Sequence, residues 1–332
     1  MKDLENFFMC LCVISNEKKF MYIWDRKKSN PLVIMLKNLS ELHDMARRHS
    51  RRRLVLAAAH DAQALGAVID AYNNDLIDGI LIGDEQKMRD IAQKHDLDLG
   101  AFVVKDEPDN ARAAAMAVKM VREGEADILM KGNLGTSVLL KAVLNKEYGL
   151  RTGEQISHLA LFELTAYHKL IGLTDAAMNI APELSEKVSI VRNAIGYFHK
   201  LGIEKPRVAM LSAVETINPA MKSSVDAGII AKMGDRGQIR HCIIDGPLAF
   251  DNAVSKKSAE LKGILSPVAG DADILVADDI DAANGLYKAL IYFAGARCAA
   301  VILGAAAPIV LTSRADTDET KLNSIALAAA VE

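Results

Sequence analysis

A strand, a turn and a helix are signalled together by Gly304-Ala-Ala-Ala-Pro-Ile-Val-Leu-Thr-Ser-Arg-Ala-Asp-Thr-Asp-Glu-Thr-Lys321. The apolar run over residues 299–307 predicts a buried strand that Pro308 ends. Residues 309–311 lead into a polar turn, and a last helix is expected to open from it. This order of elements is typical of α/β proteins.

The polar turn places a hydroxyl, a fixed cation and several carboxylates at a helix start. They are Ser313, Arg314, Asp316, Asp318 and Glu319. Anions bind well at such a place, because backbone N–H groups and the helix dipole point outward. A structural interpretation stays open, in which Thr312 or Ser313 caps the helix and the carboxylates occupy its first turn.

Short apolar strands alternate with helical patterns along the rest of the chain. Strands are expected at 54–59, 79–82, 102–104, 126–130, 158–164, 169–173, 208–211, 242–245 and 272–277. Such alternation predicts parallel strands joined by right-handed crossovers, and therefore an α/β sandwich. In these sheets, ligands bind at the carboxyl ends of the strands.

One strand end resembles an anion site in composition. Lys131-Gly-Asn-Leu-Gly-Thr-Ser137 follows the predicted strand 126–130 and precedes a helix. Gly132 would let the backbone approach a ligand, Thr136 and Ser137 would present hydroxyl and N–H groups, and Lys131 would supply charge. The stretch matches neither the P-loop nor the Gly-x-Gly-x-x-Gly pattern, and a plain turn with a helix cap is the alternative.

Further polar side chains are candidates for ligand contact. Lys141 lies one helical turn beyond Ser137, and Asn284 and Lys288 lie four apart on a predicted helix over 281–294. Asp175 and Asn179 follow a predicted strand and are either ligand contacts or turn and cap residues.

Two charge clusters have a functional and a structural interpretation. Asp278, Asp279 and Asp281 could suggest a metal site, or could form the acidic start of a helix. The arginines at 47, 48 and 51–53 end a predicted helix over 39–53 and could bind phosphate or form a solvated face.

Composition limits the classes of function. A formal charge of -3 argues against a general nucleic-acid binder, and 332 residues favour about two domains. The cysteines at 10, 12, 242 and 298 lack metal-site spacing and are expected to be reduced, which favours a cytoplasmic location. No apolar run approaches the ~20 residues of a membrane span.

Residues 1–34 are expected to be a poorly ordered extension, and Met35 is a candidate natural start. The apolar part of this segment, Phe7 to Ile14, follows Lys2, Asp3 and Glu5, and no small-residue cleavage site comes after it. A signal peptide is therefore not expected.

Several motifs in order resemble the phosphate acetyl/butyryl transferases from about Leu36 to the carboxyl end. In the second half they are Ile244-Asp-Gly-Pro-Leu-Ala-Phe-Asp251, Ser266-Pro-Val-Ala-Gly270, Ala277-Asp-Asp-Ile-Asp-Ala-Ala-Asn-Gly-Leu-Tyr-Lys288 and Ser313-Arg314. Upstream, Ile128-Leu-Met-Lys-Gly132, Leu150-Arg-Thr-Gly153 and Ser157-His158 resemble the butyryl branch more than the acetyl branch.

The resemblance implies reversible transfer of a short-chain acyl group, butyryl favoured, between coenzyme A and inorganic phosphate. Ser313 would hydrogen-bond the reacting carbonyl or thiol, and Arg314 would hold phosphate. Arg151 and Lys141 would bind substrate, although an arginine stands near the latter position in the acetyl branch. The resemblance also implies no bound cofactor, no active-site metal and a homodimer or larger homo-oligomer.

The catalytic base is the point at which this chain departs from the acetyl branch. That branch carries an aspartate seven residues after the serine, where this chain has Thr320. Glu319, by proximity, or Asp316 or Asp318 would have to replace it.

The expected architecture is two α/β/α sandwich domains with an active-site cleft between them, similar to isocitrate and isopropylmalate dehydrogenases. Residues 35–152 with 302–332 would form domain I, and residues 153–301 domain II. Two other functions stay open. A decarboxylating dehydrogenase would need paired aspartates with a metal and a tyrosine-lysine pair, for which only Tyr287-Lys288 is present. A non-catalytic coenzyme-binding module would explain Thr320.

Overall fold

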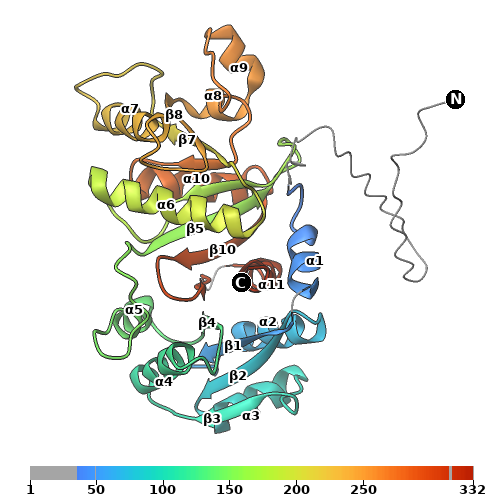
Figure 1. Ribbon diagram of the computed structural model, residues 1–332. Helices are drawn as coiled ribbons and strands as arrows, with labels where there is room; N and C mark the ends of the chain where they lie inside the picture. Colours follow the sequence, from blue (N-terminus) through green and yellow to red (C-terminus); the bar gives the residue numbers. More distant parts are fainter. Residues whose placement is uncertain (1–35, 49, 314–315, 332) are drawn as a thin grey trace, which may run out of the picture. The chain divides into compact units, whose positions relative to one another are not determined.

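The computed structural model describes residues 36–48, 50–313 and 316–331 (Figure 1). The expectations for residues 1–34 and for the side chain of Arg314 lie outside the described residues. The strands are β1 Arg52–Ala57, β2 Ile77–Gly83, β3 Val103–Asp106, β4 Ile128–Lys131, β5 Ser157–Glu163, β6 Ile171–Thr174, β7 Arg207–Leu211, β8 Ile243–Leu248, β9 Ile274–Val276, β10 Arg297–Leu303 and β11 Ile309–Val310. The helices are α1 Ser40–Arg48, α2 Ala62–Asn73, α3 Glu85–His95, α4 Asn110–Arg122, α5 Thr136–Val143, α6 Leu184–Lys200, α7 Lys222–Asp235, α8 Phe250–Val254, α9 Lys256–Leu261, α10 Ile280–Tyr292 and α11 Asp318–Ala329.

The strands form one mixed sheet in the order β3-β2-β1-β4-β11-β10-β5-β6-β9-β7-β8. The predicted parallel pairing is found in two blocks, from β3 to β11 and from β6 to β8. Between them, β10 runs antiparallel to both β11 and β5, and β5 runs antiparallel to β6. The α/β prediction is confirmed, whereas an all-parallel arrangement is wrong for the centre of the sheet.

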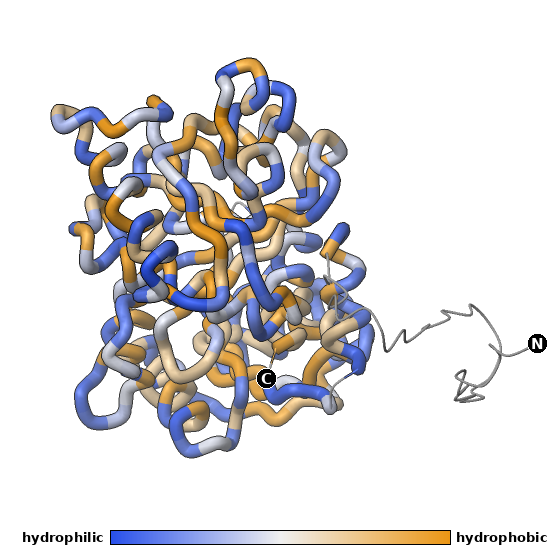
Figure 2. Tube along the Cα trace, turned by 45° about the horizontal axis from the view of Figure 1, so that its top comes forward, coloured by the Kyte–Doolittle hydropathy of each residue, from blue (hydrophilic) through white to orange (hydrophobic). Residues whose placement is uncertain are grey.

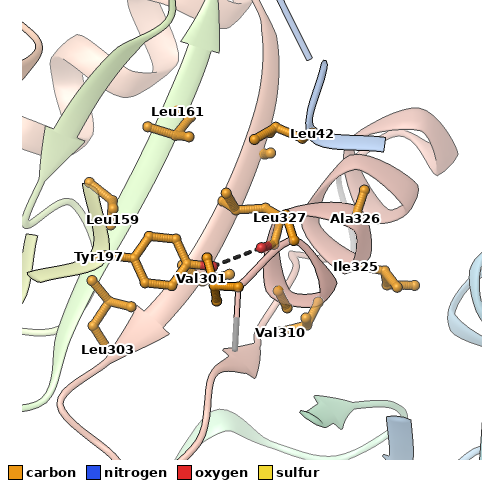
Figure 3. Close-up of a cluster of buried hydrophobic side chains, with 14 of the residues drawn as sticks. Leu42, Leu159, Leu161, Tyr197, Val301, Leu303, Val310, Ile325, Ala326 and Leu327 are labelled. Carbon is orange, nitrogen blue, oxygen red and sulfur yellow. Dashed lines mark hydrogen bonds between the residues drawn. The ribbon is translucent and has the colours of Figure 1, made fainter. Parts of the chain in front are cut away.

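Side chains of each strand alternate between two faces, as strand geometry requires. On one face, which we call the α11 face, residues such as Leu159, Leu161, Val301 and Val310 pack with α11 in a single large cluster (Figure 3). The other face, which we call the α10 face, carries two large, separate clusters. The α5 cluster lies under α4 and α5, and the α10 cluster lies under α8, α9 and α10. A further, small cluster of Ala176, Ala277 and Ala283 packs with Tyr287 of α10. Hydrophilic residues gather on the peripheral helices and loops (Figure 2).

The carboxyl-terminal strand is shorter than the sequence predicts, and the last helix begins later. β10 ends at Leu303, because Gly304 turns the chain at φ 88° and a Cβ there would meet the Gln155 carbonyl oxygen at 2.3 Å. Thr312 and Ser313, either of which the structural interpretation offered as the cap, do not cap the helix. Thr317 does so instead, accepting the N–H of Thr320.

The short β11 leaves part of the β10 edge without a strand partner. The Ala300 N–H there donates to the hydroxyl of Ser324 at 2.9 Å, and the Cys298 carbonyl accepts from the amide of Asn323 at 3.5 Å. α11 thus supplies side chains where β11 ends, which satisfies buried backbone groups. Among the described residues, no helix has both the length and the apolar character to cross a membrane.

Candidate active site

The two anion-site candidates of the sequence follow neighbouring interior strands, β4 and β11, at their carboxyl ends. β4 and β11 pair in parallel, with Ile309 opposite Leu129 and Val310 opposite Met130. Because neighbouring strands lie about 4.8 Å apart, the turns that leave them start next to each other. The chain therefore leaves β4 toward Lys131–Ser137 and leaves β11 toward Ser313 from neighbouring positions in the sheet, although more than half of the chain separates these segments.

In the first turn, Gly132 serves packing. Its N–H donates to the Ala57 carbonyl at 2.9 Å, and a Cβ at this position would lie 2.3 Å from the Ala58 carbonyl oxygen. The N–H of Asn133 is likewise bound to Ala58, at 2.8 Å. These contacts give Gly132 a structural reason to lack a side chain, and the approach of a ligand to its backbone stays a prediction.

The start of α5 remains the part of this turn best suited to an anion. Its N-cap is Gly135, which has no side chain to bond the first-turn N–H groups, and Thr136 and Ser137 follow. Lys131 lies beside it, with Nζ 3.2 Å from the Gly132 carbonyl and 3.3 Å from that of Leu134. Unbonded N–H groups and a nearby ammonium attract negative charge.

The second turn is closed by its own carboxylate. Asp316 accepts the N–H of Ser313 at 2.6 Å, and its own N–H donates to the Ser313 carbonyl at 3.2 Å. The Asp316 carbonyl accepts from Nζ of Lys321, a side chain only 3% exposed. This turn presents Ser313 at the surface.

The other two carboxylates of the second turn point elsewhere. Glu319 accepts from Nε of Arg297 at 2.6 Å, and Arg297 also pairs with Glu163 at 3.0 Å. These contacts hold Glu319 at the amino end of β10. Asp318 is exposed in the first turn of α11.

A buried histidine lies on the α10 face near the second turn. His158 of β5 is opposite Ile302, which is itself opposite Ile309. Its ring meets Tyr287 edge-on at 6.1 Å between centroids, and Tyr287 meets Phe162 at 5.3 Å. Burial lowers the pKa of His158, and the charges of Asp175 and Asp316 only partly oppose this.

Asp175 and Asn179 form a structural turn after β6. One oxygen of Asp175 accepts the N–H groups of Ala177 and Met178, both at 2.9 Å, and the other accepts from Asn179 at 2.5 Å. Asn179 also donates to the Ile156 carbonyl at 2.8 Å. Of the two interpretations left open, these contacts favour the turn and cap role.

The remaining predicted contacts are dispersed. Asn284 donates to the Ala176 carbonyl at 3.0 Å and so ties α10 to the turn after β6, while Lys288 and Lys141 are exposed. Arg151 forms a bridge with Ala305, before the amino end of β11, whereas Ser313 lies beyond its carboxyl end.

The acidic and basic clusters have local partners. Asp278 pairs with Lys187, and Asp279 caps α10 by accepting the Ala282 N–H at 2.8 Å. Among the described residues, no group of three His, Cys, Asp or Glu side chains is placed to hold a metal ion. Arg51 pairs with Asp75, and Arg53 with Asp127 at 2.8 Å, which favours the structural interpretation of the basic cluster.

The two described cysteines are poor nucleophiles. Burial raises the pKa of the Cys298 thiol to about 12 and that of Cys242 to about 11. Both thiols therefore stay protonated at neutral pH.

A family model described as "Phosphate acetyl/butaryl transferase" matches residues 38–115 and 107–329. The chain belongs to this family. It is 47% identical, over 297 residues, to a phosphate butyryltransferase of Clostridium beijerinckii, which covers 90% of this chain and 98% of that relative. It is also 42% identical to a phosphate acetyltransferase of Thermotoga maritima, in an alignment that covers 88% of this chain and 98% of that relative.

A solved structure has the same fold. The crystal structure of a branched-chain phosphotransacylase from Enterococcus faecalis V583 matches with a TM-score of 0.75 and 35% sequence identity, covering 83% of this chain and 97% of that one. The family resemblance inferred from the motifs is thereby confirmed.

Sequence reasoning assigned no role to His158 or Lys321. His158 stands inside an apolar strand pattern, where a single polar residue is a weak signal. Its position beside Tyr287 depends on α10, which is distant in the chain. Lys321 sits in a helical pattern like any surface lysine, and only its contact with Asp316 distinguishes it.

Proposed function

We propose that this protein is a phosphate acyltransferase that reversibly transfers a short-chain acyl group, butyryl favoured, between coenzyme A and inorganic phosphate. One observation carries the proposal. In a chain of this family, β4 and β11 pair in parallel, and the segments that leave them lead to the start of α5, which no side chain caps, and to Ser313. This pairing supports a shared site for the two segments. An anion site next to a hydroxyl is what transfer of an acyl group to phosphate requires.

In this proposal, phosphate binds at the start of α5. The N–H groups and hydroxyls of Thr136 and Ser137 would meet it, and Arg314 and Lys131 would balance its charge. Ser313 would hydrogen-bond the reacting carbonyl or thiol. Lys141, Arg151, Asn284 and Lys288 are proposed to contact the longer coenzyme.

A base is needed to form the thiolate of coenzyme A. A free thiol with a pKa near 8.5 is only a few per cent ionised at neutral pH, so a positioned base contributes roughly 10²–10⁴-fold. We assign this role to Asp316 in preference to Glu319. Asp316 lies in the same turn as Ser313, while Glu319 is held by Arg297.

A matched pair of isosteric variants tests this assignment. Asp316→Asn is expected to lower kcat by roughly 10²-fold or more, and Glu319→Gln by less than about 10-fold. The thermal midpoints of both variants should be measured as well, because Asp316 also bonds the Ser313 N–H. A greater loss of kcat in Glu319→Gln would return the base role to Glu319.

The wider organisation is also proposed. Two α/β/α domains would flank the cleft, one formed by residues 35–152 with 302–332 and the other by residues 153–301. The proposed boundary between residues 301 and 302 falls inside β10, which lies in the centre of the sheet between β11 and β5. The protein would act in the cytoplasm as a homodimer or larger homo-oligomer, without a bound cofactor.

The decisive experiment is thiol release from acetyl-, propionyl-, butyryl- and isobutyryl-coenzyme A, with and without phosphate. The expected result is phosphate-dependent release that is greatest with four-carbon thioesters and falls at least about 10²-fold in Arg314→Ala. A maximum with acetyl-coenzyme A would instead indicate acetyltransferase specificity, since one or two methylenes contribute only about 1–3 kcal/mol. No phosphate-dependent release with any thioester would favour a non-catalytic coenzyme-binding module, which Thr320 would explain.

A further inference from the structure

His158 occupies an unusual place on the α10 face. It is a polar side chain that is only 6% exposed, and it stands among the apolar residues of this face. Its neighbour along β5 on that face, Ala160, belongs to the α10 cluster, and its cross-strand neighbour Ile302 belongs to the α5 cluster. The imidazole therefore lies at the line where the two clusters part.

The two ring nitrogens of His158 differ in their surroundings. Nδ1 is fully enclosed and has no hydrogen-bond partner. Only one other side-chain atom in the described part of the chain, Oδ1 of Asn252, shares this condition. Since buried polar atoms are nearly always bonded, the unpartnered Nδ1 calls for an explanation. Nε2 does not share this enclosure, so it is the nitrogen through which the ring can reach a ligand.

These surroundings select one form of the ring. An enclosed N–H without an acceptor is rarer in proteins than an enclosed lone pair without a donor, so Nδ1 is best left unprotonated. The proton of the neutral ring then resides on Nε2. The imidazolium would add an N–H at Nδ1 with no acceptor, and burial lowers the pKa of the ring accordingly.

The groups that face the ring come from three places in the chain. Asp316 precedes α11, Asp175 follows β6, and Tyr287 belongs to α10, where its hydroxyl contacts Cys298 of β10. Burial raises the pKa values of Tyr287 and Cys298, which keeps both neutral. Among the described residues, the charges that act on the ring are those of two carboxylates. A carbonyl group, which is neutral before reaction, can accept a hydrogen bond beside them without the repulsion that an anion would meet.

We propose that His158, as a neutral imidazole protonated on Nε2, donates a hydrogen bond to the carbonyl oxygen of the acyl group during transfer. The inference rests on the proposed function. The coenzyme thiolate adds to the carbonyl carbon of the acyl phosphate, a C–S bond forms, and the carbonyl electrons move onto oxygen. When they return, the C–O bond to phosphate breaks and phosphate leaves. His158 keeps its proton throughout and stabilises the oxygen while it is negative.

Two substitutions separate this role from a base role. His158→Gln keeps an N–H donor near the position of Nε2 but cannot act as a base, whereas His158→Met keeps the bulk and removes the donor. With butyryl-coenzyme A and phosphate, we expect kcat to fall about 10²–10³-fold in His158→Met and less than about 10-fold in His158→Gln, with KM little changed. Tyr287→Phe, which keeps the ring contact, should retain wild-type kcat.

The pH profile of kcat gives an independent result. His158→Gln should keep the acid limb of the wild-type enzyme, because His158 does not titrate in the reaction. Equal loss of kcat in both His158 variants, or an acid limb that disappears in His158→Gln, would overturn the proposal. If His158→Met does not fold, as judged by its thermal midpoint, the comparison of the wild-type and His158→Gln profiles decides. Inactive wild-type enzyme would refute the proposed function itself, whereas active enzyme with unaffected His158 variants would refute only this inference.

Discussion

Both faces of the sheet are apolar, but the apolar residues form one large cluster on the α11 face and separate clusters on the α10 face. On the α11 face, one cluster runs from Leu54 of β1 through Val301 of β10 to Val276 of β9. On the α10 face, the apolar residues divide between Ile302 and Ala300 of the same strand. His158 and the Ser313–Thr317 turn lie near this division. One face therefore has a continuous apolar core, whereas the other is divided, and the site that we propose lies near the division.

The largest expected effect is on the α11 face. Phe198 of α6 is 2% exposed, and its ring packs against Gly172 of β6, where a Cβ would lie 3.1 Å away. Phe198→Ala should lower the free energy of unfolding by about 3–5 kcal/mol, because it leaves a cavity in the continuous cluster. Urea unfolding checks this, with Phe293→Ala as control, since Phe293 is 93% exposed. A loss below about 1 kcal/mol would contradict the continuity of this face.

A smaller effect is expected where the α11-face helices meet the strand end before α10. Lys187 of α6 donates to Asp226 of α7 at 2.7 Å and also pairs with Asp278. Asp226→Asn should cost about 1.5–3 kcal/mol, because it weakens charged hydrogen bonds but keeps the shape of the side chain. The control is Asp235→Asn, whose pair with Lys232 is exposed. Equal losses of unfolding free energy in the two variants would show that burial of the Lys187–Asp226 pair does not increase its contribution to stability.

The same pair has a defined pH dependence. Burial alone would raise the pKa of Asp226, but hydrogen bonds from Lys187 and Lys222 hold it below its usual value. Its contribution is therefore complete above the unfolded pKa and is lost as the pH falls through the lower folded pKa. The difference in unfolding free energy between wild type and Asp226→Asn should shrink on acidification, and a constant difference would contradict this.

Next in size is a change in the turn beside the divided face. Gly132→Ala places a Cβ 2.3 Å from the Ala58 carbonyl oxygen. We expect a loss of about 1–2 kcal/mol in unfolding free energy, together with lower acyltransferase activity, as the turn shifts. Gly135→Ala is the matched control, because its nearest neighbour would be at 3.8 Å. Equal stabilities for the two variants would exclude the close approach of this turn to β1.

The smallest effect concerns His158 and stability in acid. Since burial lowers its pKa when folded, the unfolded chain takes up a proton below about pH 6.5 that the folded chain does not. Stability is therefore retained above that pH and lost below it, by at most about 1.4 kcal/mol per pH unit. Urea unfolding of His158→Gln between pH 7.5 and 5.5 should show a smaller decline than that of wild type. Parallel declines would mean that His158 is already accessible to protons in the folded state.

Local sequence patterns determined much of this protein. The alternating strands and helices, the polar turns after β4 and β11, and the family motifs can all be read from residues adjacent in the chain. Strand periodicity and turn composition are local properties, so Lys131–Ser137 and Ser313–Glu319 emerged as candidates without any knowledge of pairing.

Only the tertiary structure decided which groups meet. The antiparallel pairing of β10 with β5 and β11 brings His158 into line with Ile309, and no local pattern encodes that register. The structure also shows that Gly132 packs against the end of β1, that Glu319 accepts a hydrogen bond from Arg297, and that Thr317 caps α11. The partners of Gly132 and Glu319 are not their neighbours in the chain. Their local patterns therefore could not predict that Ala57 and Ala58 contact Gly132 or that Arg297 binds Glu319. The helix is capped at Thr317 rather than at Thr312 or Ser313, because Asp316 accepts the Ser313 N–H in a turn that precedes the helix.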